Sequence, residues 1–425
     1  MISPEDGCVQ VTAHNIPASW SCLRLSHFIA NLDSGVSVNG NGRPAAEGEQ
    51  GVLKVSSVTL GYFNPRENKL IKDEDIKRSK TSPKTGAIII SRSNTPSLVG
   101  ASAFIDKDYP NLFLPDKLWQ TVYCKNVSFS KKWLAYYLAC EYVRFKLTSF
   151  ATGSSSSMCN ITKSELLSLP VYTPPLSEQK AIADILSTWD RAIEKTEALI
   201  AAKERRKKGL MQQLLTGRVR FGEFAGQEWQ EKPLGALFEE VKDVVGEKDI
   251  PPYSISAGIG FVSQREKWGK DIAGRQYSKY THLRKGEFAY NKGNSKRYQC
   301  GCAYLVRESD EISVPNVFIS FRKKHNNICA DFYEHFFIAN YHSRELKKYI
   351  TSGARSDGLL NLNKKDFFKI LVPCPLYAEQ KAIADVLNKS VAEIEAHQKQ
   401  LSALKEQKKG LMQQLLTGKM RVKGV

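Results

Sequence analysis

A duplicated segment divides this chain of 425 residues. Residues 178–217 align with residues 379–418 without a gap, and 22 of the 40 aligned positions are identical. The identities gather at the two ends of the segment, where EQKAIAD and KKGLMQQLLTG stand in both copies at an offset of 201 residues. This repeat constrains the architecture more than any other feature, because both copies are expected to adopt the same local structure.

Each copy of the repeat predicts one long helix. Prolines precede the copies at Pro174, Pro175 and Pro375, and glycines follow them at Gly217 and Gly418, as is typical of helix boundaries. In both copies apolar residues recur at alternating steps of three and four, which lets two helices pack along their length. The apolar residues of this seam are Leu186, Trp189, Ile193, Ile200, Leu210, Leu214, Leu387, Ile394, Leu401, Leu411 and Leu415.

The connections predict that the two helices run antiparallel. About eleven residues, 218–228, separate the first helix from the next globular stretch, which leads directly into the second helix. That stretch must therefore contact the C-terminal end of the first helix and the N-terminal end of the second. By the symmetry of the repeat, the first globular stretch is expected at the opposite end of the helix pair. A coiled-coil arm that dimerises the chain is the alternative interpretation of the same pattern.

The two globular stretches show a similar order of elements. Residues 87–91, 288–290 and 317–321 are strand-like, whereas 131–146 and 333–349 are helix-like. We therefore predict an α+β chain in which two similar mixed α/β domains are joined by two long antiparallel helices, a coiled-coil spacer with pseudo-twofold symmetry. The predicted boundaries are 1–176 for the first domain, 177–217 for the first helix, 218–377 for a linker and the second domain, 378–418 for the second helix and 419–425 for a C-terminal tail.

Charge and composition narrow the class of protein. The chain has 62 Lys and Arg against 44 Asp and Glu, and this formal charge of +18 favours an anionic partner such as nucleic acid. No apolar run approaches the roughly 18 residues that a membrane helix needs, and the N-terminus does not resemble a signal peptide. Nine scattered cysteines, an odd number, are typical of reduced thiols. We therefore expect a cytoplasmic protein.

The motifs that a DNA-processing enzyme carries are weak or missing. Residues 249–253 resemble the pocket in which amino-methyltransferases hold a flipped base, but Ile250 replaces the polar residue that this pocket needs. Glu178 and Glu379 begin Glu-x-Lys triples at helix starts, where a carboxylate complements the helix dipole. The sequence has no Gly-x4-Gly-Lys-Ser/Thr phosphate loop and no metal-ligand spacing around its cysteines. It thus predicts no catalytic and no metal-binding residue.

Polar loops supply the candidate contacts to DNA. They are a Gly-rich stretch at 39–43, a stretch at 91–95 directly after a predicted strand, and a stretch at 290–298 in the equivalent place of the second domain, with 352–357 beside it. Guanidinium, amide and hydroxyl groups in such loops are suited to base edges in the major groove. The candidate DNA-binding residues are Asn41, Arg43, Ser91, Arg92, Ser93, Asn94, Thr95, Asn291, Lys292, Asn294, Ser295, Lys296, Arg297, Tyr298, Arg355 and Ser356.

The motifs PPLSEQKAIADIL, KKGLMQQLLTG and SRSNTPSLVG together resemble the specificity subunits of type I restriction-modification systems (HsdS), and the resemblance covers nearly the whole chain. It implies a non-catalytic subunit with two target-recognition domains, each of which reads one half of a bipartite, interrupted double-stranded DNA sequence. The helices with their seam residues would form the spacer and the docking surface for two methyltransferase subunits, which recruit restriction subunits. S-adenosylmethionine, ATP and Mg would be used by these partners and not bound by this chain.

Two other functions stay open at this point. One is a self-sufficient DNA methyltransferase or nuclease, which activity from this chain alone would establish. The other is a coiled-coil scaffold without DNA specificity, which absent or sequence-independent DNA binding would favour.

Overall fold

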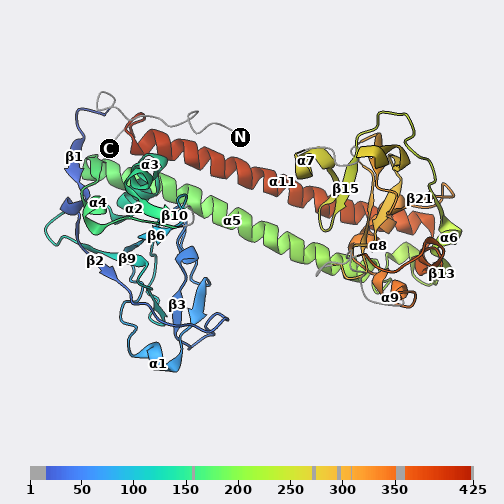
Figure 1. Cartoon of the computed structure of the whole chain (residues 1–425), viewed down its shortest axis with the longest axis horizontal. Helices are drawn as coiled ribbons and strands as arrows, with labels where there is room; N and C mark the ends of the chain where they lie inside the picture. Colours follow the sequence, from blue (N-terminus) through green and yellow to red (C-terminus); the bar gives the residue numbers. More distant parts are fainter. Residues whose placement is uncertain are drawn as a thin grey trace. The chain divides into compact units, whose positions relative to one another are not determined.

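The computed structural model describes residues 16–155, 158–269, 274–293, 298–307, 309–350 and 359–422. It divides into two compact units, of which the first comprises residues 1–196 with 400–425 and the second comprises residues 197–399. Each of the two long helices therefore contributes one segment to each unit (Figure 1). Over the described residues, no helix is both long enough and apolar enough to cross a membrane.

The first unit is built on a four-stranded antiparallel sheet in the order β2-β9-β5-β7. Its strands are β2 (Ile29–Ser34), β9 (Leu118–Tyr123), β5 (Ile88–Ser91) and β7 (Ser102–Phe104). Two helices, α2 (Lys131–Ala139) and α3 (Glu141–Phe150), share one apolar core with this sheet. The smaller elements are β1 (Ser21–Arg24), β3 (Gly51–Leu53), β4 (Asn68–Leu70), β6 (Ser93–Asn94), β8 (Leu112–Phe113), β10 (Thr152–Ser155), β11 (Met158–Asn160), β12 (Pro170–Thr173), α1 (Asp73–Ile76) and α4 (Lys163–Leu167).

The second unit repeats this plan. Its main sheet has the order β14-β21-β18-β19, formed by β14 (Phe238–Glu240), β21 (Ile319–Lys323), β18 (Phe288–Asn291) and β19 (Cys302–Leu305). Helix α8 (Ala330–Ile338) shares the core of this sheet, as α2 does in the first unit. The smaller elements are β13 (Gln230–Pro233), β15 (Tyr253–Ser256), β16 (Gly260–Ser263), β17 (Thr281–Arg284), β20 (Glu311–Val314), β22 (Leu371–Cys374), α6 (Leu234–Leu237), α7 (Gln264–Trp268), α9 (Ser343–Leu346) and α10 (Lys364–Phe367).

The first and last strands of each unit also correspond. The pair β1 and β12 is antiparallel in the first unit, as is the pair β13 and β22 in the second. In both units the last strand leads directly into a long helix. The prediction of two similar α+β domains, inferred from the order of apolar patterns, is therefore confirmed.

The repeat forms two helices of nearly equal length, α5 (Leu176–Leu214) of 39 residues and α11 (Tyr377–Leu416) of 40 residues. At about 1.5 Å per residue each is about 60 Å long. In the first unit Lys408 of α11 forms an ion pair with Asp190 of α5. In the second unit Lys203 of α5 lies 2.7 Å from Glu393 of α11. Arg421 also pairs with Glu178 in the first unit, and Arg220 pairs with Glu379 in the second. In each unit the residue numbers of one segment therefore rise as those of the other fall, which shows that the segments run antiparallel, as predicted.

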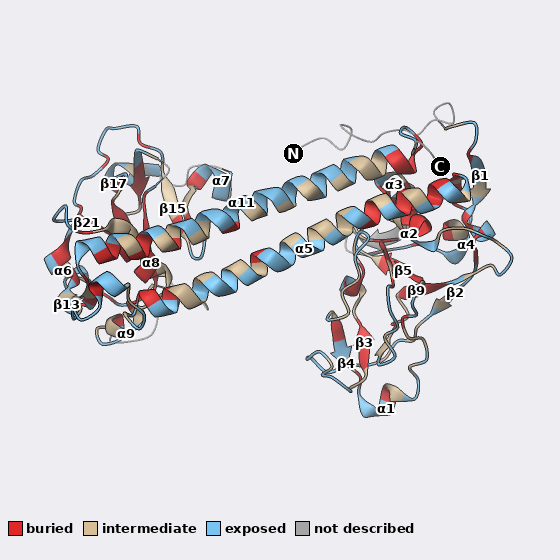
Figure 2. Cartoon of the chain, turned by 180° about the vertical axis from the view of Figure 1, so that it is seen from behind, coloured by how far each residue is buried: buried red, intermediate tan, exposed pale blue. Residues whose placement is uncertain are grey.

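Burial along the two helices follows the predicted seam. Every one of the eleven seam residues is buried or half-buried, and Leu186 and Leu387 are fully buried in the cores of their units. Figure 2 shows the resulting alternation of buried and exposed residues along α5 and α11. Leu186, Leu411 and Leu415 contribute to the apolar core of the first unit, and Leu210, Leu214 and Leu387 contribute to that of the second.

Two helix predictions need correction. The helix-like stretch at 131–146 is two helices, because the chain turns into an extended conformation at Cys140 (ψ 154°) between α2 and α3. The stretch at 333–349 is divided between α8 and α9, and Asn340 lies between them with a φ of 63°. Asn tolerates this left-handed conformation better than most residues, and it ends a helix that the apolar pattern alone would continue.

A buried carboxylate begins each long helix, and the same contacts surround it in both units. Arg421 donates two hydrogen bonds to Glu178, of 2.6 and 2.8 Å, and the indole of Trp20 donates a third of 3.1 Å. Burial alone would raise the pKa of Glu178, but the hydrogen bonds from Arg421 and Trp20 outweigh it, and the pKa lies below its ordinary value. The glutamate therefore does more than complement the helix dipole.

The equivalent carboxylate of the second unit is Glu379. Arg220 donates to it at 2.8 and 2.6 Å, and Trp229 donates at 3.0 Å. Arg220 and Arg421 are separated by the same 201 residues as the repeat, so the repeated structure extends beyond Gly217 and Gly418. We call these two groups, Trp20 with Glu178 and Arg421, and Trp229 with Glu379 and Arg220, the carboxylate clusters.

A fully buried histidine, His342, predicts that the second unit loses stability in acid. His342 packs against the rings of Tyr290 and Phe337, and burial lowers its pKa from 6.5 to about 4. His342 binds a proton more readily in the unfolded chain than in the folded chain. The folded second unit therefore keeps the full contribution of neutral His342 to its free energy of unfolding above pH 6.5, and loses it as the pH falls from 6.5 to 4. The shift corresponds to a loss of about 3 kcal/mol.

Leucine is similar to histidine in volume but does not bind a proton. We therefore expect His342→Leu to reduce the loss of stability in acid by about 3 kcal/mol. Hydrogen exchange of the second unit, followed from pH 7 to pH 4, measures the loss in both proteins. An equal loss in wild type and variant would contradict this assignment to His342.

Candidate nucleic-acid interface

The segment 91–95 of the first unit leaves the central sheet at the end of β5. Its strand β6 pairs with β11, which places Asn94 opposite Cys159 and Ser93 opposite Asn160. The backbone N–H of Ile161 donates to the carbonyl of Arg92 at 3.0 Å. These contacts join two stretches that are more than 60 residues apart in the sequence. They fix the backbone of residues 91–95, which we call the reading segment of the first unit.

The side chains of this segment differ in what they offer to a ligand. Ser91 and Ser93 are buried, with exposed fractions of 0% and 4%, so the expectation that their hydroxyls contact DNA is corrected. The amide of Asn94 is engaged locally, because it donates to Ser91 Oγ and accepts from the N–H of Thr95. Thr95 is exposed. Arg92 is half-exposed and lies 6.0 Å from the ring centroid of Trp119. Arg92 is therefore the strongest candidate for reading a base in this unit.

The stretch 39–43 is held by the protein itself. The N–H of Asn39 donates to the carboxylate of Asp75 at 2.8 Å, and the N–H of Asn41 donates to the carbonyl of Leu70 at 2.8 Å. These bonds engage the backbone donors of Asn39 and Asn41 within the protein. The side chain of Asn41 is exposed and is still able to contact DNA.

Arg43 is paired with an acidic residue of its own loop. Its guanidinium donates to both carboxylate oxygens of Glu49, at 2.6 and 2.7 Å, and these bonds lower the pKa of Glu49 to about 2. A guanidinium held in this way has fewer donors left for a phosphate or a base. Arg43 is exposed, so its contact with DNA stays a prediction, but it is a weaker candidate than Arg92.

In the second unit the equivalent segment follows β18. The N–H of Leu360 donates to the carbonyl of Lys292 at 3.0 Å, as that of Ile161 does to Arg92, and Gly293 forms a β-bridge with Leu359. Asn291 and Lys292 are half-exposed, and Asn291 Oδ1 accepts from the N–H of Gly293 at 2.9 Å. The two segments predicted to be equivalent thus occupy equivalent places in the two units.

The remaining candidates of the second unit divide into two groups. Tyr298 is buried, with an exposed fraction of 3%, and its ring belongs to an apolar cluster, so the expected DNA contact is corrected. The others lie outside the described residues and are Asn294, Ser295, Lys296, Arg297, Arg355 and Ser356.

Ile250, part of the weak methyltransferase-like motif, has a structural role. Its side chain is buried, its N–H donates to the hydroxyl of Tyr277 at 2.5 Å, and its carbonyl accepts from Ser313 Oγ at 3.1 Å. Nothing about this position resembles an open base pocket. The described residues also contain no group of three or more His, Cys, Asp or Glu side chains placed to hold a metal ion.

Comparison with known proteins identifies the family. The family model for the type I restriction modification DNA specificity domain matches residues 37–203 and 272–406, which is more than half of the chain. The chain belongs to this family. One matched range lies in each half of the chain, in agreement with the duplicated architecture.

Two curated relatives of similar length are named as type I restriction enzyme specificity subunits. The chain is 25% identical to the putative type I restriction enzyme MjaX specificity subunit of Methanocaldococcus jannaschii, over 96% of this chain and 95% of the relative. It is 24% identical to the type I restriction enzyme MjaVIII specificity subunit of the same organism, over 99% and 97%. These findings support the predicted role of a specificity subunit and do not favour the alternative functions.

Solved structures of the family share the fold. The type I restriction-modification system S subunit from M. genitalium superposes with a TM-score of 0.54 at 18% identity and covers 94% of this chain and 96% of its own. A chain from a structural study of complex assembly and conformational transition of the type I system also gives 0.54, at 13% identity, with coverages of 95% and 99%. At such low identity these structures establish the fold and do not transfer individual DNA contacts.

Proposed function

We propose that this specificity subunit recognises a bipartite DNA sequence, and that each unit reads one half of it. The observation that carries the proposal is the repeated placement of a polar segment directly after β5 in one unit and β18 in the other. The backbone carbonyl of Arg92 in the first segment and that of Lys292 in the second accept equivalent hydrogen bonds. The segments differ in sequence whereas the strands that support them correspond. Two readers on one scaffold fit two different half-sites, by the same geometry that dimeric DNA-binding proteins use.

The charge distribution supports contact of both units with DNA. Residues 1–176 carry 19 basic and 14 acidic side chains, and residues 218–377 carry 26 and 19. The excess of positive charge in these two stretches is therefore 5 and 7, which is two thirds of the total of 18. Lys and Arg near phosphates release counterions, so the binding is expected to weaken steeply with added salt.

We infer that the chain itself is not catalytic and that methylation and cleavage reside in partner subunits. Its relatives are named specificity subunits, and neither sequence nor described residues show a catalytic constellation. Two methyltransferase subunits would dock on the outward faces of α5 and α11, and restriction subunits would join through them. These partners would use S-adenosylmethionine, ATP and Mg, and we expect the complex in the cytoplasm.

Selection from a random duplex library tests this proposal. The purified chain with the methyltransferase subunits of its own system should enrich two short defined blocks separated by a constant number of undefined base pairs. Enrichment of a single continuous block would contradict the bipartite reading. Equal retention of all sequences would contradict DNA specificity altogether.

A further inference from the structure

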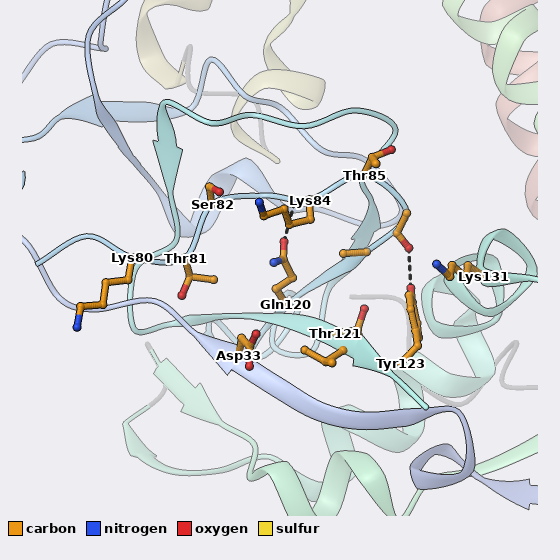
Figure 3. A pocket seen from close by; sticks show the side chains of 13 residues that line it. Asp33, Lys80, Thr81, Ser82, Lys84, Thr85, Gln120, Thr121, Tyr123 and Lys131 are labelled. Atoms are coloured by element: carbon orange, nitrogen blue, oxygen red, sulfur yellow. Dashed lines mark hydrogen bonds between the residues drawn. The ribbon is translucent and has the colours of Figure 1, made fainter. Parts of the chain in front are cut away.

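A basic cleft lies on the first unit, away from the reading segment. It is bounded by the segment 80–87 that leads into β5, by β2 and β9, and by the first residue of α2 (Figure 3). Three lysines line it, Lys80, Lys84 and Lys131, and all three are exposed. The predicted DNA contacts do not include any of them.

The ammonium group of Lys131 lies over an aromatic ring. It lies 4.9 Å from the ring centroid of Tyr123, and a Cβ atom placed on Gly86 would meet its Nζ at 3.7 Å. The hydroxyl of Tyr123 donates to the carbonyl of Gly86 at 2.9 Å, which closes the wall behind the lysine. The ring attracts the ammonium group without forming an ion pair with it, so its positive charge is not compensated by a carboxylate.

The segment that carries Lys84 is fastened to β9 by two buried side chains. Gln120 Oε1 accepts from the N–H of Lys84, and Thr121 Oγ1 accepts from the N–H of Ile88, both at 2.9 Å. Each of these side chains is only 5% exposed. Gln120 Nε2 has no hydrogen-bond acceptor among the described residues, and Figure 3 shows this amide inside the cleft. The cleft therefore has a fixed wall and an available donor.

The charges that line the cleft favour an anion. Asp33 is the one carboxylate of the lining, and it accepts a hydrogen bond from Asn31 at 2.9 Å. Across the part of the chain that the structure describes, no carboxylate oxygen lies within 4.0 Å of the amino group of Lys80, Lys84 or Lys131. Three uncompensated ammonium groups against one carboxylate attract a compact negative group.

We propose that this cleft binds a phosphate of the DNA backbone, within one duplex turn of the base that the reading segment contacts. A phosphate is favoured over a base, because Lys131 already occupies the face of Tyr123 that a base would need for stacking. Strand β5 leads from the cleft at Ala87 to the reading segment at Ser91, about 13 Å at the usual rise of a strand. That distance is well within one turn of a duplex. This proposal rests on the proposed function.

The salt dependence of DNA binding tests the cleft. In the complete complex, Lys80→Ala with Lys84→Ala and Lys131→Ala should lower the slope of log K against log salt by about 1 for each phosphate lost, roughly an 8-fold loss of affinity at 0.1 M salt. The loss should be the same for target and non-target duplexes, and the methylated sequence should not change. The matched control replaces three exposed lysines of the same unit outside the cleft, Lys107, Lys125 and Lys132, with alanine.

Each outcome has a distinct meaning. Replacing the three cleft lysines with arginine should retain the wild-type slope, which separates loss of charge from loss of folding. A slope equal to that of the control would overturn the proposal, and so would a changed methylated sequence, since the cleft would then read bases. Failure of the triple alanine variant to assemble with the methyltransferase subunits would also overturn it, in favour of a protein contact. If the wild-type complex prefers no sequence at all, the proposed function fails instead.

Discussion

Replacing Glu379 with alanine should destabilise the second unit by about 3 kcal/mol, because it leaves three N–H donors without their buried acceptor. Glu379 is fully buried and accepts three hydrogen bonds, two from Arg220 and one from Trp229. The guanidinium of Arg220 is itself only 17% exposed, so water replaces the lost carboxylate poorly. Hydrogen exchange of residues 197–399, recorded at increasing denaturant concentration, measures the change in the free energy of unfolding.

Glu393 supplies a matched control on the same helix. It also pairs with a basic side chain, Lys203, but it is 54% exposed, and such surface pairs contribute about 0–1 kcal/mol. Glu393→Ala should therefore change little. An equal loss for Glu379→Ala and Glu393→Ala would show that the carboxylate cluster contributes no more than a surface ion pair.

The equivalent change Glu178→Ala should destabilise the first unit in the same way. The depressed pKa of Glu178 also makes the stability of the first unit depend on pH. The ionised carboxylate stabilises the folded state at pH values above 4.5, the pKa of glutamate in the unfolded chain. This contribution is lost as the pH falls through the lower pKa of Glu178 in the folded chain. Glu178→Gln should reduce this acid-dependent loss.

Replacing Arg92 with alanine should alter the DNA sequence that the complex methylates. A bidentate contact from arginine to a guanine accounts for about 1–3 kcal/mol of discrimination, which is roughly a 5- to 150-fold change in preference at one base pair. Arg92 stands directly after β5, is half-exposed and lies over Trp119, so its guanidinium is positioned and still accessible. Methylation sequencing with the variant complex measures the preference at each position.

Arg43→Ala is the control for this experiment. Its guanidinium is bound to both carboxylate oxygens of Glu49, so its removal should leave the methylated sequence unchanged. If Arg92→Ala retains full affinity and the same methylated sequence, the first reading segment has been placed wrongly. If Arg43→Ala changes that sequence, the Arg43 to Glu49 pair must open when DNA binds.

The long helices were predictable because their signal is repeated and periodic. The seam residues set the period, and Pro175 and Pro375 set the starts, which lie within one residue of the structure. The similarity of the two domains was also predictable, since Ile88–Ser91 and Phe288–Asn291 both follow a Lys-and-Gly turn and both form the second strand from an edge of their sheet.

The side-chain contacts were less predictable, because they join residues far apart in sequence. Arg421 and Glu178 are 243 residues apart, and nothing in a local pattern links them, although the offset of 201 between Arg220 and Arg421 was a signal available to extend the repeat. The predicted DNA contacts of Ser91 and Tyr298 were wrong for a similar reason. Polar and aromatic residues beside a strand resemble a binding loop in sequence, whereas their burial depends on the packing of the whole domain.

The most direct measurement of the central claim is the map of methylated bases in a host that expresses the complete system, with and without this chain. With the chain, methylation should appear at one bipartite motif with a fixed spacer. Exchange of residues 229–350 for the corresponding stretch of a relative should change one half of that motif and leave the other half intact. A methylation pattern that is the same in the presence and absence of this chain would contradict its role as the specificity subunit.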